Sequence, residues 1–464
     1  MSITKLTKTK VEQLGHWAAN IHWEDLSVEA RKALKARVLD SVGCAIGALE
    51  GEPVKAIHKM TLDLGGNPYT TLIGEGHTTP ENAAFYNGAA VRYLDFNDSY
   101  LAKGETCHPS DNIAPVLAAA EFADADGRDF LLALALAYQV QCRLSDVAPV
   151  RSHGFDHTVQ GAYGAAAGAA RAMGLSAKQI ANAVAIAGTS YNSLRVTRTG
   201  ELSNWKGLAF PNTARGAVHA ALLARYGITG PREVFEGNKG FMDAISGPFD
   251  IDWSKEDLER VTQTITKRFN AEIHSQSSIE GLLELRDRVQ LPPEEIAHIR
   301  LYTFDVAYNI IGGGEEGGKK LIRRKEEADH SLPYMLAAAY LDGKVMPEQY
   351  LPERIKRQDI QELLQKVDVS PDQAYSDRFP DEMACRIEME AKDGRLFQIE
   401  KSDYQGFKTR PAKWGTLMEK YRGLTRNIDH QLAEKIAVAV ANLENIKVSQ
   451  LTALLGQIKI QEGE

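Results

Sequence analysis

The chain has 464 residues, a length that suggests two or three domains and a large hydrophobic core. Hydrophobic residues make up 44% and charged residues 25%, which is typical of folded globular proteins and argues against a largely disordered chain. The formal net charge of −8 argues against a nucleic-acid-binding protein that works through bulk positive charge. A polyanionic ligand would therefore bind only where cationic side chains gather locally.

We expect no segment of the sequence to cross a membrane or to direct export. The most apolar run, residues 130–138, is much shorter than the ~20 residues that a bilayer requires. Residues 1–10 (MSITKLTKTK) lack the apolar stretch of a signal peptide. The cysteines form no CxxC pair and offer no zinc-site spacing: they are Cys44, Cys107, Cys142 and Cys385. A cytoplasmic protein with reduced thiols is the expected result.

Helical patterns and small residues dominate the chain from its start to about residue 266. Residues 27–49 carry apolar side chains on one helical face, and Pro80 with Glu81 suits the first turn of another helix. Ser176 and Gln179 form a capping-box pattern before a run with helical spacing. The glycine- and alanine-rich residues 161–174 follow no buried strand, so close helix packing is favoured over a nucleotide-binding turn.

A different pattern begins at about residue 267. Residues 296–306, 385–389 and 396–400 are rich in strand formers, and an Asp-Gly pair between the last two predicts a hairpin. Helices are expected among them, at about 277–287, 329–341 and 357–366, and helical patterns return after residue 411. We therefore predict a mainly α protein. Residues 1–266 and 405–464 would form one large all-helical domain, and residues 267–404 would form a smaller α+β lid.

A glycine-rich segment, residues 312–320 (GGGEEGGKK), partly matches a phosphate-binding loop. However, Lys320 stands where that loop needs a Ser or Thr to hold magnesium, and two adjacent glutamates would repel phosphates. The segment is therefore predicted to be a flexible surface loop, with mobility near a binding cleft as a further possibility.

The polar segment 93–121 is the strongest candidate for chemistry. Three acid or amide side chains (Asp95, Asn97 and Asp98) precede Ser99, and His108-Pro-Ser-Asp-Asn follows before a helix expected near Ile113. His108 would then lie at a helix N-terminus, where anions bind well. A polar loop with capping residues is the alternative interpretation.

The motifs LDFND and HPSDN in this segment closely resemble the signature of the MmgE/PrpD family. That family includes 2-methylcitrate dehydratases, cis-aconitate decarboxylases and iminodisuccinate epimerases. Further similar pieces follow in the same order along the chain: GFDHT at 154–158, NWKG at 204–207, KRFNAEIHSQ at 267–276 and ADHSLPY at 328–334. The resemblance implies a homodimer with a helical domain and an α+β lid, without metal or organic cofactor. HPSDN is most similar to the 2-methylcitrate dehydratase branch.

The resemblance also implies an active site, position by position. The implied catalytic residues are Asp95, His108, Lys206, Lys267 and His157, although the spacing around the last one varies in the family. The implied substrate-binding residues are Ser99, which stands where threonine is common, His274 and His330. The pair His153 and His157 has metal-ligand spacing, but Gly154 and Asp156 argue against an ordered helix there, so no metal site is predicted.

These residue types suit the removal of water from a citrate-like acid. A proton beside a carboxylate is weakly acidic, so the developing negative charge needs cations such as Lys206 and Lys267, which could clamp two carboxylates. His108, oriented or charged by Asp95, is the first candidate for proton transfer, and His157 or His274 would take the complementary role. Decarboxylation and epimerisation need the same equipment, and a non-catalytic helical dimer scaffold is the alternative outside enzymology. The expected partner is a small polycarboxylate, with no nucleic acid and no membrane.

Overall fold

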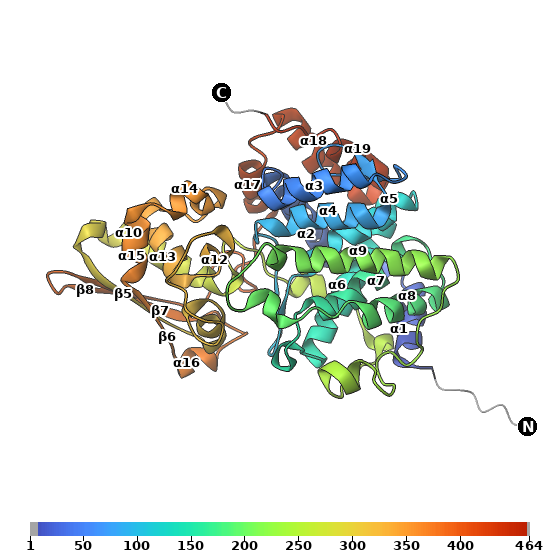
Figure 1. The fold of residues 1–464 in the computed structure, drawn as a ribbon, viewed down its shortest axis with the longest axis horizontal. Helices are drawn as coiled ribbons and strands as arrows, with labels where there is room; N and C mark the ends of the chain where they lie inside the picture. The colour runs from blue at the N-terminus through green and yellow to red at the C-terminus, as the bar shows by residue number, and fades with distance from the viewer. Residues whose placement is uncertain (1–7, 462–464) are drawn as a thin grey trace, which may run out of the picture.

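The computed structural model describes residues 8–461 and has two lobes of unequal size. Figure 1 shows a large helical lobe that contains the blue, green and red parts of the chain, and a small yellow-to-orange lobe with a sheet. The protein is mainly α, as predicted. The predicted lack of a signal peptide rests on residues 1–10, of which 1–7 lie outside the described part.

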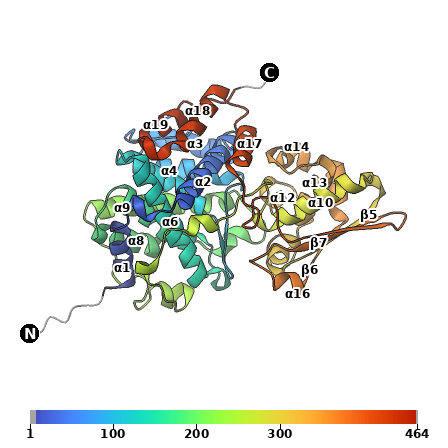
Figure 2. The ribbon, with the colours of Figure 1, turned by 180° about the vertical axis from the view of Figure 1, so that it is seen from behind.

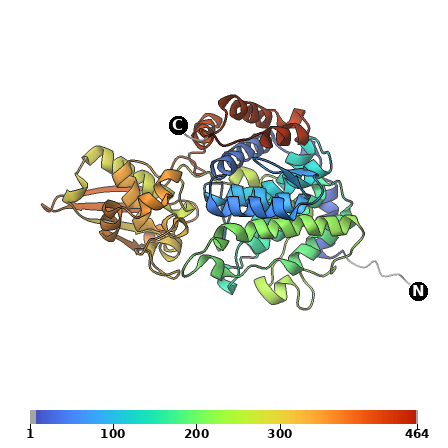
Figure 3. The ribbon, with the colours of Figure 1, turned by 45° about the horizontal axis from the view of Figure 1, so that its top comes forward.

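The large lobe is built from helices of both ends of the chain. Figure 3 shows the red C-terminal helices beside the blue N-terminal ones, and α17 packs on α2. Its helices are α1 (Lys10–Ala19), α2 (Val28–Gly47), α3 (Glu52–Leu64), α4 (Pro80–Tyr93), α5 (Ile113–Phe122), α6 (Gly127–Val147), α7 (Thr158–Ala172), α8 (Ala177–Ser190), α9 (Trp205–Arg225), α17 (Trp414–Leu424), α18 (His430–Ala441) and α19 (Val448–Leu455). Two short hairpins join them: β1 (Thr70–Thr71) with β2 (His77–Thr78), and β3 (Tyr100–Leu101) with β4 (Thr106–Cys107).

Local sequence signals explain where several of these helices begin. The hydroxyl of Ser27 accepts a hydrogen bond from the amide of Ala30 at the start of α2. Pro80 occupies the first turn of α4, and the capping box of Ser176 and Gln179 opens α8, so both predictions are confirmed.

The glycines of α7 allow close approach of neighbouring helices. A Cβ atom at Gly164 would lie 2.8 Å from the carbonyl oxygen of Ala137 in α6. At Gly161 it would lie 2.2 Å from the ring of Phe210 in α9. The close-packing interpretation of residues 161–174 is therefore confirmed, because α7 lies against both helices without room for side chains.

The small lobe contains a four-stranded sheet in the order β6-β5-β7-β8. The strand β5 (Ile296–Thr303) pairs parallel with β6 (Val367–Pro371) and antiparallel with β7 (Cys385–Ala391), which forms the predicted hairpin with β8 (Leu396–Lys401). Figures 1 and 2 show the main helices on one side of this sheet. The helices of the lobe are α10 (Gln276–Val289), α11 (Asp305–Ala307), α12 (Lys325–Ala328), α13 (Leu332–Asp342), α14 (Pro352–Ile355), α15 (Gln358–Gln365) and α16 (Gln373–Ser376).

Each lobe has its own hydrophobic core. The large core draws almost entirely on residues 11–261 and 417–458, and the second core draws on residues 269–391. A small third cluster, which includes Ile265, Phe304 and Tyr404, lies where the chain passes between the lobes. The predicted domain boundaries at 266/267 and 404/405 fall in these two crossings and stay a prediction.

The apolar run 130–138 lies in α6, where every side chain from Phe130 to Tyr138 is buried in the large core. Within residues 8–461, no helix combines the length and the apolar character that crossing a membrane requires.

Candidate active site

A narrow pocket lies between the two lobes and contains most of the predicted site residues. The large lobe supplies the loop after α4, the β3–β4 hairpin and the ends of several helices. Its lining residues are Arg92, Asp95, Glu105, Thr106, His108, Arg151, His157, Arg195 and Arg198. The small lobe contributes Glu272, His274, Ile310, Glu316 and His330.

His108 is held in one tautomer by the backbone. It directly precedes the 3₁₀ turn Pro109–Asn112, which leads into α5, and its Nδ1 lies 2.8 Å from the carbonyl oxygen of Asp98. Because a carbonyl oxygen only accepts, Nδ1 carries the hydrogen and Nε2 has a free lone pair. Burial, assisted by the charge of Arg92, lowers the pKa of His108 well below its usual value. A neutral imidazole with a free Nε2 is suited to accept a proton.

Of the two effects expected of Asp95 on His108, the electrostatic one is present, because the charge of Asp95 opposes the fall in the pKa of His108, whereas the orienting hydrogen bond is made to the carbonyl of Asp98. Ser99 takes the nearer position, since its Oγ lies 3.0 Å from Nδ1 of His108. The side chain of Ser99 is fully buried behind the imidazole and does not line the pocket. Ser99 is thereby placed to support His108, whereas substrate contact was the sequence-based prediction.

His157 lies beside His108 and lacks hydrogen-bond partners. The two rings meet edge to face with centroids 5.3 Å apart. Both ring nitrogens of His157 are buried, and neither has a hydrogen-bond partner within residues 8–461, although Nε2 lies 3.7 Å from Oδ1 of Asp156. Burial lowers the pKa of His157 to about 3, although the carboxylate of Asp156 opposes this shift. Asp156 itself pairs with Arg198, which fixes the residue before His157 at the entry to α7.

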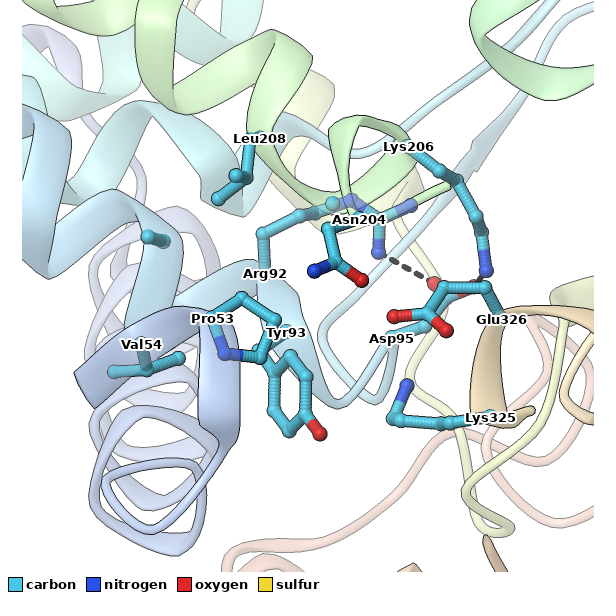
Figure 4. A pocket seen from close by; sticks show the side chains of 12 residues that line it. Pro53, Val54, Arg92, Tyr93, Asp95, Asn204, Lys206, Leu208, Lys325 and Glu326 are labelled. Atoms are coloured by element: carbon cyan, nitrogen blue, oxygen red, sulfur yellow. Dashed lines mark hydrogen bonds and ion pairs between the residues drawn. The ribbon is translucent and has the colours of Figure 1, made fainter. Parts of the chain in front are cut away.

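Asp95 is the centre of a buried cluster of charges. Its backbone is left-handed, with φ of 56°, a conformation that residues other than glycine rarely adopt. The ammonium of Lys267 donates to its Oδ1 at 2.8 Å and to its carbonyl oxygen at 2.7 Å, and Arg92 donates to Oδ1 as well. Figure 4 shows Arg92 and Lys206 directed toward Asp95. Burial alone would raise the pKa of Asp95, but these cations lower it well below its usual value.

A second buried carboxylate, Asp329, extends this cluster into the small lobe. The ammonium of Lys206 donates to Oδ1 of Asp329 at 2.7 Å and lies 2.8 Å from Nδ1 of His330. Lys325 donates to the other oxygen, Oδ2, at 2.7 Å. Lys206 belongs to α9 and the other three residues to the small lobe, so this network connects the lobes. Burial lowers the pKa of Lys206, while Asp329 opposes the shift.

Asp95, Asp329 and His330 are close enough to hold a metal ion, with ligand atoms within 4.8 Å of one another. The donor set does not fit one, because the ammonium of Lys206 already contacts all three, at 3.7 Å from Asp95. Lys267, also on Asp95, adds further repulsion to an incoming cation. The expectation of chemistry without metal stays a prediction.

His274 is oriented by an acid from its own segment. Its Nδ1 lies 2.8 Å from Glu272, and its Nε2 lies 3.3 Å from the hydroxyl of Thr106 on the opposite lobe. Burial would raise the pKa of Glu272, but the neighbouring His274 lowers it to about 2. Glu272 therefore stays ionised and fixes the imidazole at the pocket wall.

The cations that reach the pocket wall are arginines that the sequence interpretation missed. Arg92, Arg151, Arg195 and Arg198 line the pocket, whereas Lys206 and Lys267 lie behind Asp95. None of these arginines belongs to a recognisable motif. Two short segments could have indicated them: RVTR at 195–198, which contains two arginines, and VRSH at 150–153, which directly precedes GFDHT.

Two further acids in the pocket were also missed. Burial raises the pKa of Glu105, whose carboxylate accepts from the backbone amides of Val150 and Arg151 at 3.2 and 3.1 Å. Glu316 belongs to the glycine-rich segment 312–320 and is buried, as is Lys319. The prediction of a surface loop is therefore wrong for these two residues, because Glu316 pairs with arginines of the opposite lobe.

Comparison with known proteins gives the family of this chain. The family model described as the MmgE/PrpD N-terminal domain matches residues 12–254, and the MmgE/PrpD C-terminal domain matches residues 269–445. The chain belongs to the MmgE/PrpD family.

The similar family members are named for one of two activities, cis-aconitate decarboxylation or 2-methylcitrate dehydration. Mouse cis-aconitate decarboxylase is 28% identical over 461 residues, which cover 92% of this chain and 89% of the relative. The 2-methylcitrate dehydratase of Escherichia coli K12 is 28% identical over 395 residues, or 78% of each chain. The mitochondrial 2-methylcitrate dehydratase of Yarrowia lipolytica is 26% identical over 428 residues, or 86% and 81%. The relatives are thus enzymes that act on small carboxylates, and both activities occur at similar identity.

Proposed function

We propose that this protein is a lyase that eliminates water from 2-methylcitrate or a similar tricarboxylate by abstracting a proton beside a carboxylate, without a metal ion. The observation that carries the proposal is the neutral His108, whose Nε2 is free while its Nδ1 is bound to the carbonyl of Asp98, in a pocket lined by four arginines. A base beside several fixed cations is what elimination from a polycarboxylate requires.

In the proposed reaction, Nε2 of His108 takes the proton from the carbon beside a carboxylate. The electron pair of the broken C–H bond forms the carbon–carbon double bond, the C–O bond breaks, and the departing hydroxide is protonated to water. The proton comes from His274 or Glu105, which both line the same pocket, because burial keeps His157 unprotonated at neutral pH. Charge that develops on the carboxylate is stabilised by fixed donors, each commonly worth about 3 kcal/mol.

Asp95, Lys206 and Lys267 have a supporting role in this proposal. The two lysines and Arg92 surround the carboxylate of Asp95, so the pocket wall next to His108 keeps positive charge in a dry environment. Lys206 also holds His330 and Asp329 of the opposite lobe in place.

Decarboxylation of cis-aconitate is the second candidate, because a decarboxylase relative covers 92% of the chain at 28% identity. The presence of more than one proton-transfer group supports elimination, which needs both a base and an acid. Epimerisation of a dicarboxylate is the third candidate.

Ultraviolet absorbance during incubation with 2-methylcitrate or citrate tests the proposal, since elimination creates a conjugated unsaturated acid. Carbon dioxide release from cis-aconitate without such a signal would indicate the decarboxylase. A change in optical rotation alone would indicate an epimerase. Absence of all of these signals with every tricarboxylate and dicarboxylate tested would favour the non-catalytic scaffold.

We also propose that the protein is a cytoplasmic homodimer. The four cysteines are free and buried, which suits a reducing compartment. Large apolar side chains such as Leu194, Val196 and Tyr226 are 58%, 68% and 82% exposed, and burial against a second copy would remove them from water. Light scattering coupled to size-exclusion chromatography gives the mass, and a monomer at micromolar concentration would contradict the dimer.

A further inference from the structure

Glu316 of the small lobe lies in the pocket against two arginines of the large lobe. Arg195 donates to its Oε1, and Nη2 of Arg151 lies 3.2 Å from the same oxygen. The second oxygen, Oε2, is buried and has no hydrogen-bond partner in the described chain, and the same is true of Nε of Arg195. One carboxylate oxygen of Glu316 therefore accepts from both arginines. Its second oxygen and the Nε–H of Arg195 make no hydrogen bond, although they could form one with suitable partners.

The hydrogen bonding between Glu316 and the two arginines is incomplete for an arginine–carboxylate pair. Such pairs are strongest when two parallel hydrogen bonds join the guanidinium to both carboxylate oxygens. A buried polar atom without a partner is costly, so a ligand carboxylate that used both oxygens would be bound more favourably than Glu316.

The other two arginines of the pocket have partners from their own lobe. Arg198 pairs with Asp156, and Arg92 pairs with Asp95, within the large lobe. Arg195 also lies 3.6 Å from Asp156, but the hydrogen-bonded partner that it shares with Arg151 is Glu316 of the opposite lobe. Exchange of Glu316 for a ligand would leave the contact between Arg195 and Asp156 within the large lobe in place.

The segment that carries Glu316 is rich in glycine. Five glycines surround it in residues 312–318, and Gly313 and Gly317 have φ of 111° and 92°, a region that side chains rarely adopt. Glu316 lines both the pocket and a second hollow, which is formed with residues 200–202, 317–319, 321–323 and 327. Glu316 therefore lies where the pocket and this second hollow adjoin.

We propose that Arg151 and Arg195 form a subsite for one carboxylate of the substrate, and that Glu316 occupies this subsite until the substrate displaces it. The inference rests on the proposed function in one respect, the polycarboxylate nature of the ligand. It assigns Glu316 the role of an internal competitor that selects ligands with a carboxylate at this end of the pocket.

Calorimetric titration with tricarballylate tests the proposal, because this tricarboxylate lacks the hydroxyl group and cannot eliminate water. Glu316→Gln removes the competing charge, and we expect it to bind tricarballylate at least tenfold more tightly than the unaltered protein. Arg195→Gln and Arg151→Gln should each bind at least tenfold more weakly. Glu315→Gln is the matched control, since this neighbouring glutamate is exposed, and its affinity should change less than twofold.

The opposite signs of these effects separate the proposal from a purely structural ion pair. If the pair only joined the lobes, removal of either partner would change affinity in the same direction, and that outcome would overturn the proposal. The midpoint of thermal unfolding with and without tricarballylate provides a second measurement, with a larger ligand-induced increase expected for Glu316→Gln.

Failure of the proposed function gives a different result. Opposite signs without turnover of any tricarboxylate would leave the subsite intact and contradict the lyase. Turnover with unchanged affinity in Glu316→Gln would leave the lyase and contradict the subsite. Absence of tricarballylate binding to every variant would overturn the subsite.

Discussion

The imidazole of His108 is oriented by a main-chain carbonyl, which fixes its tautomer without placing a charged group beside the ring. Burial keeps His108 neutral and the Asp98 carbonyl accepts from its Nδ1, whereas Nδ1 of His274 lies 2.8 Å from the carboxylate of Glu272. The two imidazoles of one pocket therefore have different partners, a main-chain carbonyl for His108 and a carboxylate for His274.

His108→Asn should lower kcat by a factor of 10² to 10⁴, on the order of the contribution of a positioned general base. The amide of asparagine retains a donor for the Asp98 carbonyl, so tricarballylate affinity should change little. His153→Asn provides the control, since His153 is an exposed histidine four residues from His157. Unchanged kcat in His108→Asn, measured by absorbance, would remove His108 from the mechanism.

Lys206 and Lys325 bind the same carboxylate and offer a matched comparison. Lys206 also contacts His330 and lies 3.7 Å from Asp95, whereas Lys325 approaches Asp329 from its other oxygen. Lys206→Met should lower kcat/KM by about 10², which corresponds to ~3 kcal/mol of transition-state stabilisation. Lys325→Met should lower it much less. Equal losses in steady-state kinetics would show that both lysines merely neutralise Asp329.

Stability should decrease below about pH 6.5 because of His157. Its pKa is about 3 in the folded protein and ~6.5 in the unfolded chain. Below pH 6.5 the unfolded chain therefore binds a proton at His157, whereas the folded protein does not. The stabilisation is thus present above pH 6.5 and is lost as pH falls, by about 1.4 kcal/mol per pH unit for one group. Urea unfolding at pH 7.5, 6.5 and 5.5 measures this slope. His157→Gln should make it shallower, and an unaltered slope would contradict the assignment.

The residues that carry a motif could be identified from the sequence, but their partners could not. Asp95, His108, His157, His274 and His330 line one pocket, and all five stand in segments that resemble the family. The lining arginines and Glu316 come from loops that only the fold brings together. Each contact joins residues far apart in the chain, such as the 121 positions between Arg195 and Glu316, and no local pattern records such a pair.

Sequence signals predicted the helices and strands whose formation depends on residues that are close in the chain. The α8 capping box and the β7–β8 turn depend on neighbouring residues and were confirmed. The strand β6 was missed because it has five residues, ends at Pro371 and is defined by parallel pairing with β5 about 70 positions earlier. The 3₁₀ turn at Pro109–Asn112 was expected only as a turn before α5.

Close contact between α6 and α7 makes Gly164 sensitive to substitution. Gly164→Ala places a Cβ atom 2.8 Å from the Ala137 carbonyl, so the helices must separate, at a cost of about 1–3 kcal/mol. Gly423 of α17 has open space around its Cβ position, and Gly423→Ala should instead stabilise by up to about 1 kcal/mol. Denaturant unfolding of both variants measures the difference. A stabilising Gly164→Ala would contradict the close packing of α7 on α6.

At the scale of the whole molecule, charge is distributed unevenly. The chain carries a net charge of −8, yet its interlobe pocket contains four arginines with two lysines behind them. The net negative charge disfavours nonspecific binding of nucleic acid, and the arginines gathered at the pocket attract one small anion. Both lobes contribute, so neither lobe alone contains the pocket.

Because the pocket has walls from both lobes, one bound anion should stabilise both. Tricarballylate at 100 times its dissociation constant should add about 2.7 kcal/mol to the free energy of unfolding. Hydrogen exchange followed by mass spectrometry should then show protection in residues 151–157 and 195–198 of the large lobe and in residues 272–274 and 329–330 of the small lobe. Acetate, with one carboxylate, serves as the control and should protect neither set. Protection confined to one lobe would mean that the ligand binds away from the interlobe pocket, and the roles assigned to its residues would then be wrong.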